Sequence, residues 1–83
     1  MAKINLDPCN ADRAMWAASA MANFARISDR EADLQTDPET LLGDLLTDLM
    51  HWCDIEKRHK SSVEFESALE QARLHFVAER VQE

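Results

Sequence analysis

The sequence predicts an all-α fold: a small three-helix bundle that forms a homodimer through spare apolar faces. The 83 residues include one Gly, two Pro and no Tyr, which leaves little material for hairpin turns or strands. Ala, Leu, Glu, Arg and Met, which favour helix, dominate the composition. Apolar side chains recur at three- and four-residue steps along most of the chain, as they do on the buried faces of helices.

The chain is expected to form one domain, residues 1–83, with helices at about 8–27, 38–56 and 62–82. Asp7-Pro8 and Asp37-Pro38 each place an N-cap acid before a proline at the first helical position. Ser61 and Glu64 have the spacing of a capping box. The polar stretch 28–36 is a connection with room for one helical turn.

The second helix carries the clearest apolar stripe, made of Leu42, Leu45, Leu46, Leu49, Met50 and Cys53. The third helix carries two stripes. The first is expected to close the core with the second helix and contains Phe65, Ala68, Leu69, Ala72 and Phe76. The second lies about 150° away and contains Val63, Leu74, Val77 and Val81.

Three helices of this length cannot bury so many apolar stripes within one chain, and an exposed apolar patch usually marks an interaction site. The spare faces therefore predict self-association as a homodimer. The residues expected at that contact are Trp16, Phe24 and Ile27 of the first helix, or Leu74, Val77 and Val81 of the third.

The formal net charge of −7 argues against direct binding to nucleic acid or to an anionic membrane and favours a basic protein surface as partner. Residues 29–56 contain nine acids and a single base, Arg30. One interpretation is a solvated face that keeps the protein soluble. The other is a partner-binding surface, for which the candidates are Asp37, Glu39, Asp44, Asp48 and Asp54.

A metal site is a further hypothesis. Asp44, Asp48 and His51 are spaced i, i+4, i+7, so all three could reach one Mg²⁺ ion from one strip of the helix. The alternative is that they form the solvated face opposite the leucines, and this is the preferred interpretation. No cofactor is predicted. His51 and Cys53 point about 200° apart and cannot share a zinc ion.

The two cysteines, Cys9 and Cys53, are too few for a disulfide framework and are typical of a reduced, cytosolic protein. The sequence contains no apolar run of membrane-spanning length and no signal-peptide core at its N-terminus. The expected location is the cytoplasm.

Two resemblances follow from these helices. The segment "LLGDLLTDLMHWCD" followed by "FESALEQARLHFVAER" resembles the last helical hairpin of MazG-type all-α nucleoside triphosphate pyrophosphohydrolases. The GDLL motif of that family is matched at 43–46, and the pattern of its final helix at 68–76. Leu41 replaces the Glu that the family has three residues before Asp44, and no ExxE motif lies upstream. The resemblance therefore implies a degenerate or divergent relative of that metal-dependent enzyme.

The pattern "DLLxDLMHW…ALxxARxHF" also resembles small acidic helical proteins of bacteria, phages and plasmids, a group that implies no established activity. It is matched at 44–52 and 68–76. Because the chain lacks a complete catalytic constellation, the preferred prediction is a non-enzymatic accessory or inhibitory factor of phage or plasmid origin that acts by binding another protein. The alternative is a divergent MazG-like nucleotide pyrophosphohydrolase.

Overall fold

A computed structural model describes residues 9–59 and 63–81. Their helices are α1 (Asn10–Ile27), α2 (Asp33–Thr36), α3 (Pro38–Arg58) and α4 (Phe65–Val81). None of the described residues forms a strand, so the predicted all-α class is confirmed. The three long helices correspond to the three predicted ones, and α2 adds a single turn within the polar connection. No helix in the described part of the chain combines the length and apolar character needed to cross a membrane.

The N-terminal ends of two helices differ from the prediction. Helix α1 begins at Asn10 because the Asp12 carboxylate accepts a hydrogen bond from the backbone N–H of Cys9, at 3.2 Å, which makes Cys9 the N-cap. The predicted cap, Asp7-Pro8, lies outside the described residues. Helix α4 begins at Phe65 rather than 62, and the carbonyl of Glu64 accepts the N–H of Ala68. Ser61, the other half of the predicted capping box, is also outside the described residues.

Helix α3 begins where the sequence predicts. Asp37 is its N-cap and accepts a hydrogen bond from the backbone N–H of Thr40 at 3.3 Å, and Pro38 occupies the first helical position. The helix continues to Arg58, two residues beyond the predicted end. The cations Lys57 and Arg58 in its last turn suit the negative end of the helix dipole.

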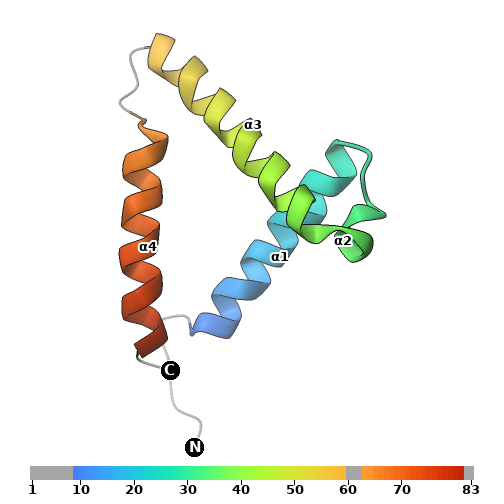
Figure 1. Cartoon of the computed structure of the whole chain (residues 1–83), viewed down its shortest axis with the longest axis horizontal. Coiled ribbons are helices and arrows are strands. Elements are labelled where there is room, and N and C mark those ends of the chain that lie inside the picture. The colour runs from blue at the N-terminus through green and yellow to red at the C-terminus, as the bar shows by residue number, and fades with distance from the viewer. Residues whose placement is uncertain (1–8, 60–62, 82–83) are drawn as a thin grey trace, which may run out of the picture.

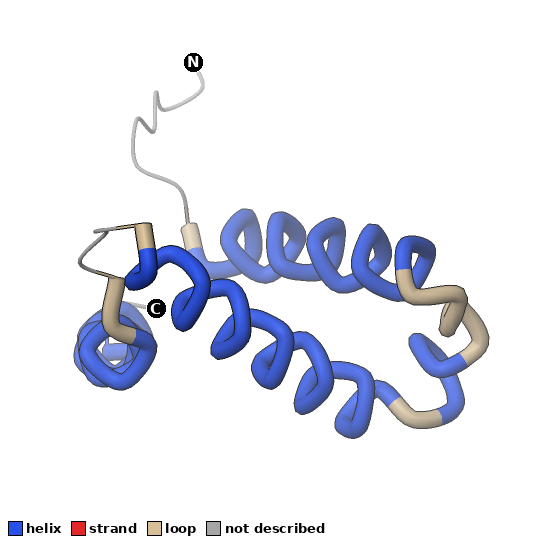
Figure 2. The backbone as a smooth tube through the Cα atoms, turned by 90° about the horizontal axis from the view of Figure 1, so that it is seen from above, coloured by secondary structure: helices blue, strands red, loops and turns tan. Residues whose placement is uncertain are grey.

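The three long helices form the sides of an open triangle (Figure 1). Helices α1 and α3 cross beside α2, and α4 returns from the end of α3 towards the start of α1. Seen from above, α1 lies in a different layer from α3, and α4 is viewed end-on (Figure 2). The molecule measures 49 × 35 × 20 Å along its principal axes, so it is flat and extended.

The buried apolar side chains among the described residues are few. Ala25 of α1 and Leu41 of α3 have no exposed surface, and Cys53 of α3 is nearly covered. The small side chain of Ala25 lets the two helices approach closely at their crossing. Leu41 fills that crossing and is the largest fully buried side chain. Ala25 and Leu41 therefore form the core at the corner where α1 and α3 cross, whereas Cys53 is buried near the junction of α3 and α4.

The prediction that the Phe65 stripe closes the core against α3 is wrong over its second half. Phe65 and Leu69 are half-buried, but Phe76 is 59% exposed. The reason is geometric: α3 and α4 are close where they join and then diverge (Figure 1). The periodicity identified the apolar face correctly but could not show that the facing helix moves away from it.

Candidate functional site

The turn after α1 positions the key cation of the molecule. The backbone N–H of Arg30 donates to the carbonyl of Ala25 at 2.7 Å, and that of Asp29 donates to Arg26 at 3.2 Å. These two bonds form a Schellman motif, in which the residue after the helix cap adopts a left-handed conformation. Asp29 has φ 59°, a position that glycine usually occupies. The turn aims the Arg30 side chain back at α2 and α3.

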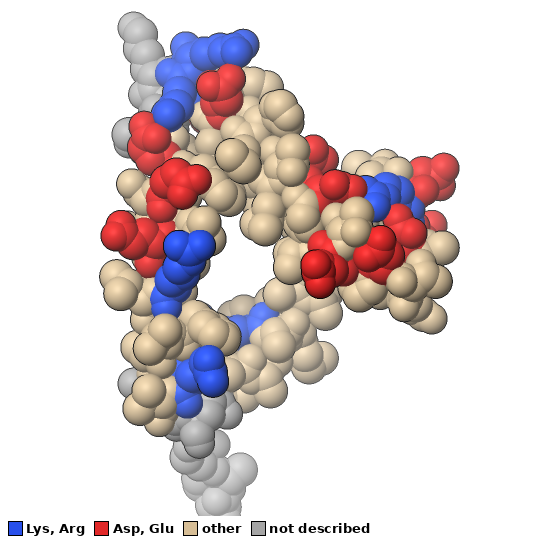
Figure 3. Space-filling view, in the orientation of Figure 1, with Lys and Arg blue, Asp and Glu red and all other residues tan. Residues whose placement is uncertain are grey.

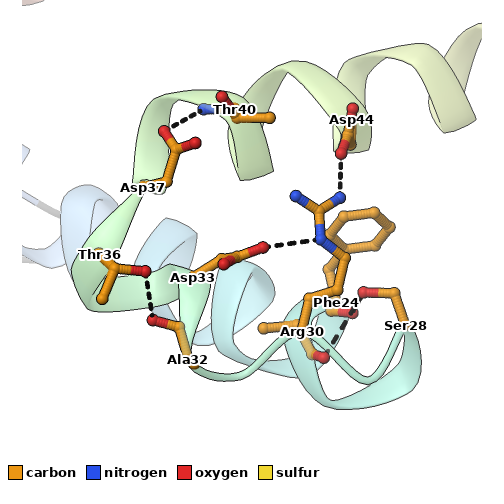
Figure 4. Close-up of polar contacts among 10 residues, drawn as sticks. Phe24, Ser28, Arg30, Ala32, Asp33, Thr36, Asp37, Thr40 and Asp44 are labelled. Carbon is orange, nitrogen blue, oxygen red and sulfur yellow. Dashed lines mark hydrogen bonds and ion pairs between the residues drawn. The ribbon is translucent and has the colours of Figure 1, made fainter.

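Arg30 joins α2 to α3 (Figure 4). Its Nε donates to Asp33 at 2.9 Å, and one of its terminal nitrogens is hydrogen-bonded to Asp44. The hydrogen bond to Asp44, followed by the one to Asp33, raises the pKa of the Arg30 guanidinium above its ordinary value. A single planar guanidinium thus holds two carboxylates from two elements, which a lysine could not do with the same geometry.

Acidic side chains surround this guanidinium. Residues 29–44 contain six acids and one base: Asp29, Glu31, Asp33, Asp37, Glu39 and Asp44, with Arg30. We call this set the acidic corner. Red side chains gather over α2 and the start of α3, around one blue side chain (Figure 3). Since Arg30 is already paired with two carboxylates, the corner keeps a formal charge of −5 at the surface.

The predicted partner-binding acids do not all present free carboxylates. Asp37 caps α3, Asp44 pairs with Arg30, and Asp54 pairs with Arg58 at 3.0 Å. Within the described residues, the salt bridges involve neither Glu39 nor Asp48. Helix geometry places these two on opposite sides of α3, nine residues apart. The predicted set did not include Asp29 and Glu31, which are exposed and belong with Glu39 to the acidic corner.

The three metal candidates are not assembled into a site. Asp44 contacts Arg30, whereas Asp48 and His51 are exposed further along α3. Residues 9–59 and 63–81 contain no group of three or more His, Cys, Asp or Glu side chains placed to hold a metal ion. Asp44, the carboxylate that matches the MazG motif, therefore forms a salt bridge with Arg30, a contact that the sequence pattern did not predict.

The predicted self-association residues lie mostly at the surface. Trp16 and Ile27 of α1 are exposed, and Phe24 is half-buried. The α4 residues of that prediction, Leu74, Val77 and Val81, are all exposed. The prediction omitted a further group, because periodicity assigned it to the core of the single chain: Leu42, Leu46, Leu49, Met50 and Phe76.

Polar contacts hold the two ends of α4. At its start, Lys57 pairs with Glu64 at 2.9 Å, and this contact raises the pKa of Lys57 above its ordinary value. At its end, Asn10 donates a side-chain hydrogen bond to the carbonyl of Glu79 at 3.0 Å, and the Arg13 and Glu79 side chains are 3.9 Å apart. Beside this second contact is a cavity of about 410 Å³, which Phe76 helps to line.

Comparison of the chain with protein-family models, with curated proteins and with solved structures found no match. The two resemblances drawn from the sequence therefore stay predictions.

Proposed function

We propose that this protein acts by binding another protein, and that its acidic corner binds a basic surface on that partner. The observation that carries the proposal is the charge of residues 29–44, six acids against one base that is already paired. A surface patch of one charge sign attracts a surface of the opposite charge and accelerates association with it.

The acidic side chains of the corner divide into two groups. Asp33 and Asp44 pair with Arg30 and so hold α2 against α3, and Asp37 caps α3. Asp29, Glu31 and Glu39 are exposed. None of the three takes part in a salt bridge among the described residues. In the proposed complex the first group fixes the shape of the surface, and the exposed group contacts Lys and Arg side chains of the partner.

The biological role that fits such a binding protein is that of an accessory or inhibitory factor in the cytoplasm. Small size and high negative charge support this role. The resemblance of the DLLxDLMHW and ALxxARxHF patterns supports an origin in a phage or plasmid.

A pull-down from a bacterial lysate tests the proposal. The bait is the full chain, and captured proteins are identified by mass spectrometry at low and at high salt. We expect a basic protein that is captured at low salt and released at high salt, because salt screens exposed charges.

The variant for this test is the double substitution Glu31→Gln and Glu39→Gln, and its matched control is Glu66→Gln with Glu70→Gln in α4. Both change the net charge by two and remove the same chemical group from exposed positions. The proposal expects lost capture for the first pair and unchanged capture for the second. Equal loss with both pairs would indicate a response to net charge alone and would contradict a role for the corner.

A further inference from the structure

A cavity lies where the start of α1 meets the end of α4, at a different corner of the triangle from α2 and the acidic corner (Figure 1). Its volume is about 410 Å³, within the range of about 300–1,000 Å³ that is typical of sites for small molecules. The residues that line it are Asn10, Arg13, Ala14, Phe76, Glu79 and Arg80. The proposed function makes no use of this cavity.

Two arginines of the cavity have guanidinium groups without a hydrogen bond. Among the side-chain hydrogen bonds of residues 9–59 and 63–81, none involves the guanidinium of Arg13 or of Arg80. Three other arginines donate to a nearby side chain: Arg26, Arg30 and Arg58. The N–H donors that converge on the cavity are therefore available to a ligand.

The contacts that these two arginines do make leave their donors free. The Nε atom of Arg13 is 3.9 Å from the Glu79 carboxylate, which is beyond hydrogen-bond distance. Arg80 lies over the Phe76 ring, with its Cζ atom 5.4 Å from the ring centroid. This cation–π contact involves the ring and the positive charge, and it uses none of the five N–H groups of a guanidinium.

The lining of the cavity combines positive charge with apolar surface. Two arginines and one glutamate give it a formal charge of +1, in a protein whose net charge is −7. Asn10 is the first residue of α1, so the positive end of that helix dipole adds to the charge. Phe76, which is 59% exposed, and Ala14 supply the apolar surface.

We propose that this cavity binds a small organic anion, in which a carboxylate is attached to a flat apolar group. The planar fork of a guanidinium matches a carboxylate, which Arg13 and Arg80 bind with their free N–H groups. The apolar group of the ligand packs against Phe76 and Ala14. Glu79 competes with the ligand for Arg13. The proposal is independent of the acidic corner and of the basic partner proposed for it.

A titration of the full chain with three probes, followed by ¹H–¹⁵N nuclear magnetic resonance, tests the class of ligand. The probes are 2-naphthoate, the uncharged 2-naphthamide, and acetate, which has the charge but no flat group. We expect saturable shifts for 2-naphthoate at the amides of residues 10–14 and 76–80, with a Kd of about 1 mM. The other two probes should bind at least about tenfold more weakly.

Three outcomes of this titration overturn the proposal. The first is the absence of saturable shifts in these two segments with 2-naphthoate at about 10 mM, ten times the expected Kd. The second is equal affinity for 2-naphthamide, which would indicate general attraction to apolar surface. The third is equal affinity for acetate, which would indicate that the flat group makes no contact.

Substitution of an arginine tests the role of the cavity. Arg80→Gln should weaken the binding of 2-naphthoate about tenfold, since it removes a charged donor. Arg73→Gln is the matched control, because it makes the same change at an exposed position of α4 that does not line the cavity. It should leave the Kd within about twofold. Equal weakening by both substitutions would indicate a response to net charge and overturn the proposal. Circular dichroism checks that both variants keep their helix content.

Substitution of the acid should have the opposite effect. Glu79→Gln removes the competitor for Arg13 and should tighten the binding of 2-naphthoate about threefold. The backbone carbonyl of Glu79, which accepts the hydrogen bond from Asn10, is unchanged by the substitution. Glu70→Gln, at an exposed position of α4, is the matched control and should leave the Kd unchanged. Equal affinities for the two variants, or weaker binding by Glu79→Gln, would overturn the assignment of an anion beside Arg13.

Discussion

The N-terminal end and the middle of α3 differ in how far the rest of the chain covers their side chains. At its N-terminal end Leu41 is fully buried, Asp37 caps the helix, and Arg30 holds two carboxylates. In its middle Leu46 and Leu49 stay partly exposed, because α4 lies against α3 only near the C-terminal end, where the two helices join. The difference follows from sequence distance. The N-terminal corner is built from residues 24–44, which a short turn brings together, whereas the middle of α3 has no neighbouring segment so close in sequence.

The difference teaches that a short helical chain can define one corner by local contacts and leave much of its remaining apolar surface exposed. A domain of this size buries a limited fraction of its surface.

Truncation of a leucine in each region should give the largest contrast. Leu41→Ala is expected to lower the free energy of unfolding by about 2–5 kcal/mol, because it leaves a cavity at the α1–α3 crossing. The same substitution at Leu74, exposed on the outer side of α4, should change it by less than about 0.5 kcal/mol. Urea denaturation followed by circular dichroism measures both. Equal decreases in the free energy of unfolding would show that Leu41 is packed no more tightly than the exposed Leu74.

Removal of the Arg30 guanidinium should have the next largest effect. Arg30→Ala leaves Asp33 and Asp44 without their cation inside a cluster of negative charges, so the Tm is expected to fall, though less than for Leu41→Ala. Arg30→Lys keeps the charge but not the fork that reaches two carboxylates, and its Tm should lie between those of the alanine variant and the unmodified protein. An unchanged Tm for Arg30→Ala would mean that α2 is held without this contact.

The left-handed residue after α1 offers a stabilising substitution. Asp29→Gly removes the steric cost of the left-handed conformation and should raise the free energy of unfolding by on the order of 1 kcal/mol. Asp29→Asn is the control, because it removes the same charge but keeps a side chain. The difference between the two variants isolates the backbone contribution, and equal stabilities would rule that contribution out.

The sequence predicted helix type, the Asp37 cap and the apolar faces, because these depend on residues close together in the chain. It did not predict that Arg30 holds Asp44, since fourteen residues and a Schellman turn separate them and an Asp, not the usual Gly, occupies the left-handed position. Nor could the stripe of Leu46 and Leu49 show whether α4 or a second chain covers it, since periodicity identifies a face and not its neighbour.

The smallest expected effect is a pH dependence at the α3–α4 junction. The salt bridge to Glu64 raises the pKa of Lys57 in the folded state above its ordinary value of 10.5. The contact therefore contributes fully below pH 10.5 and is lost as the pH rises through the higher folded-state pKa. Tm measured across that range should fall slightly more for the unmodified protein than for Lys57→Met. Parallel curves for the two proteins would show that the pair adds nothing to stability.

Amide hydrogen exchange tests the contrast between the closed corner and the open side of α4 most directly. Amides of α3 around Leu41 should be strongly protected, because Leu41 is fully buried where α1 and α3 cross. Amides of α4 around Phe76 should exchange much faster, because Phe76 is exposed and α3 has diverged from α4 there. Equal protection of the two segments would contradict the account.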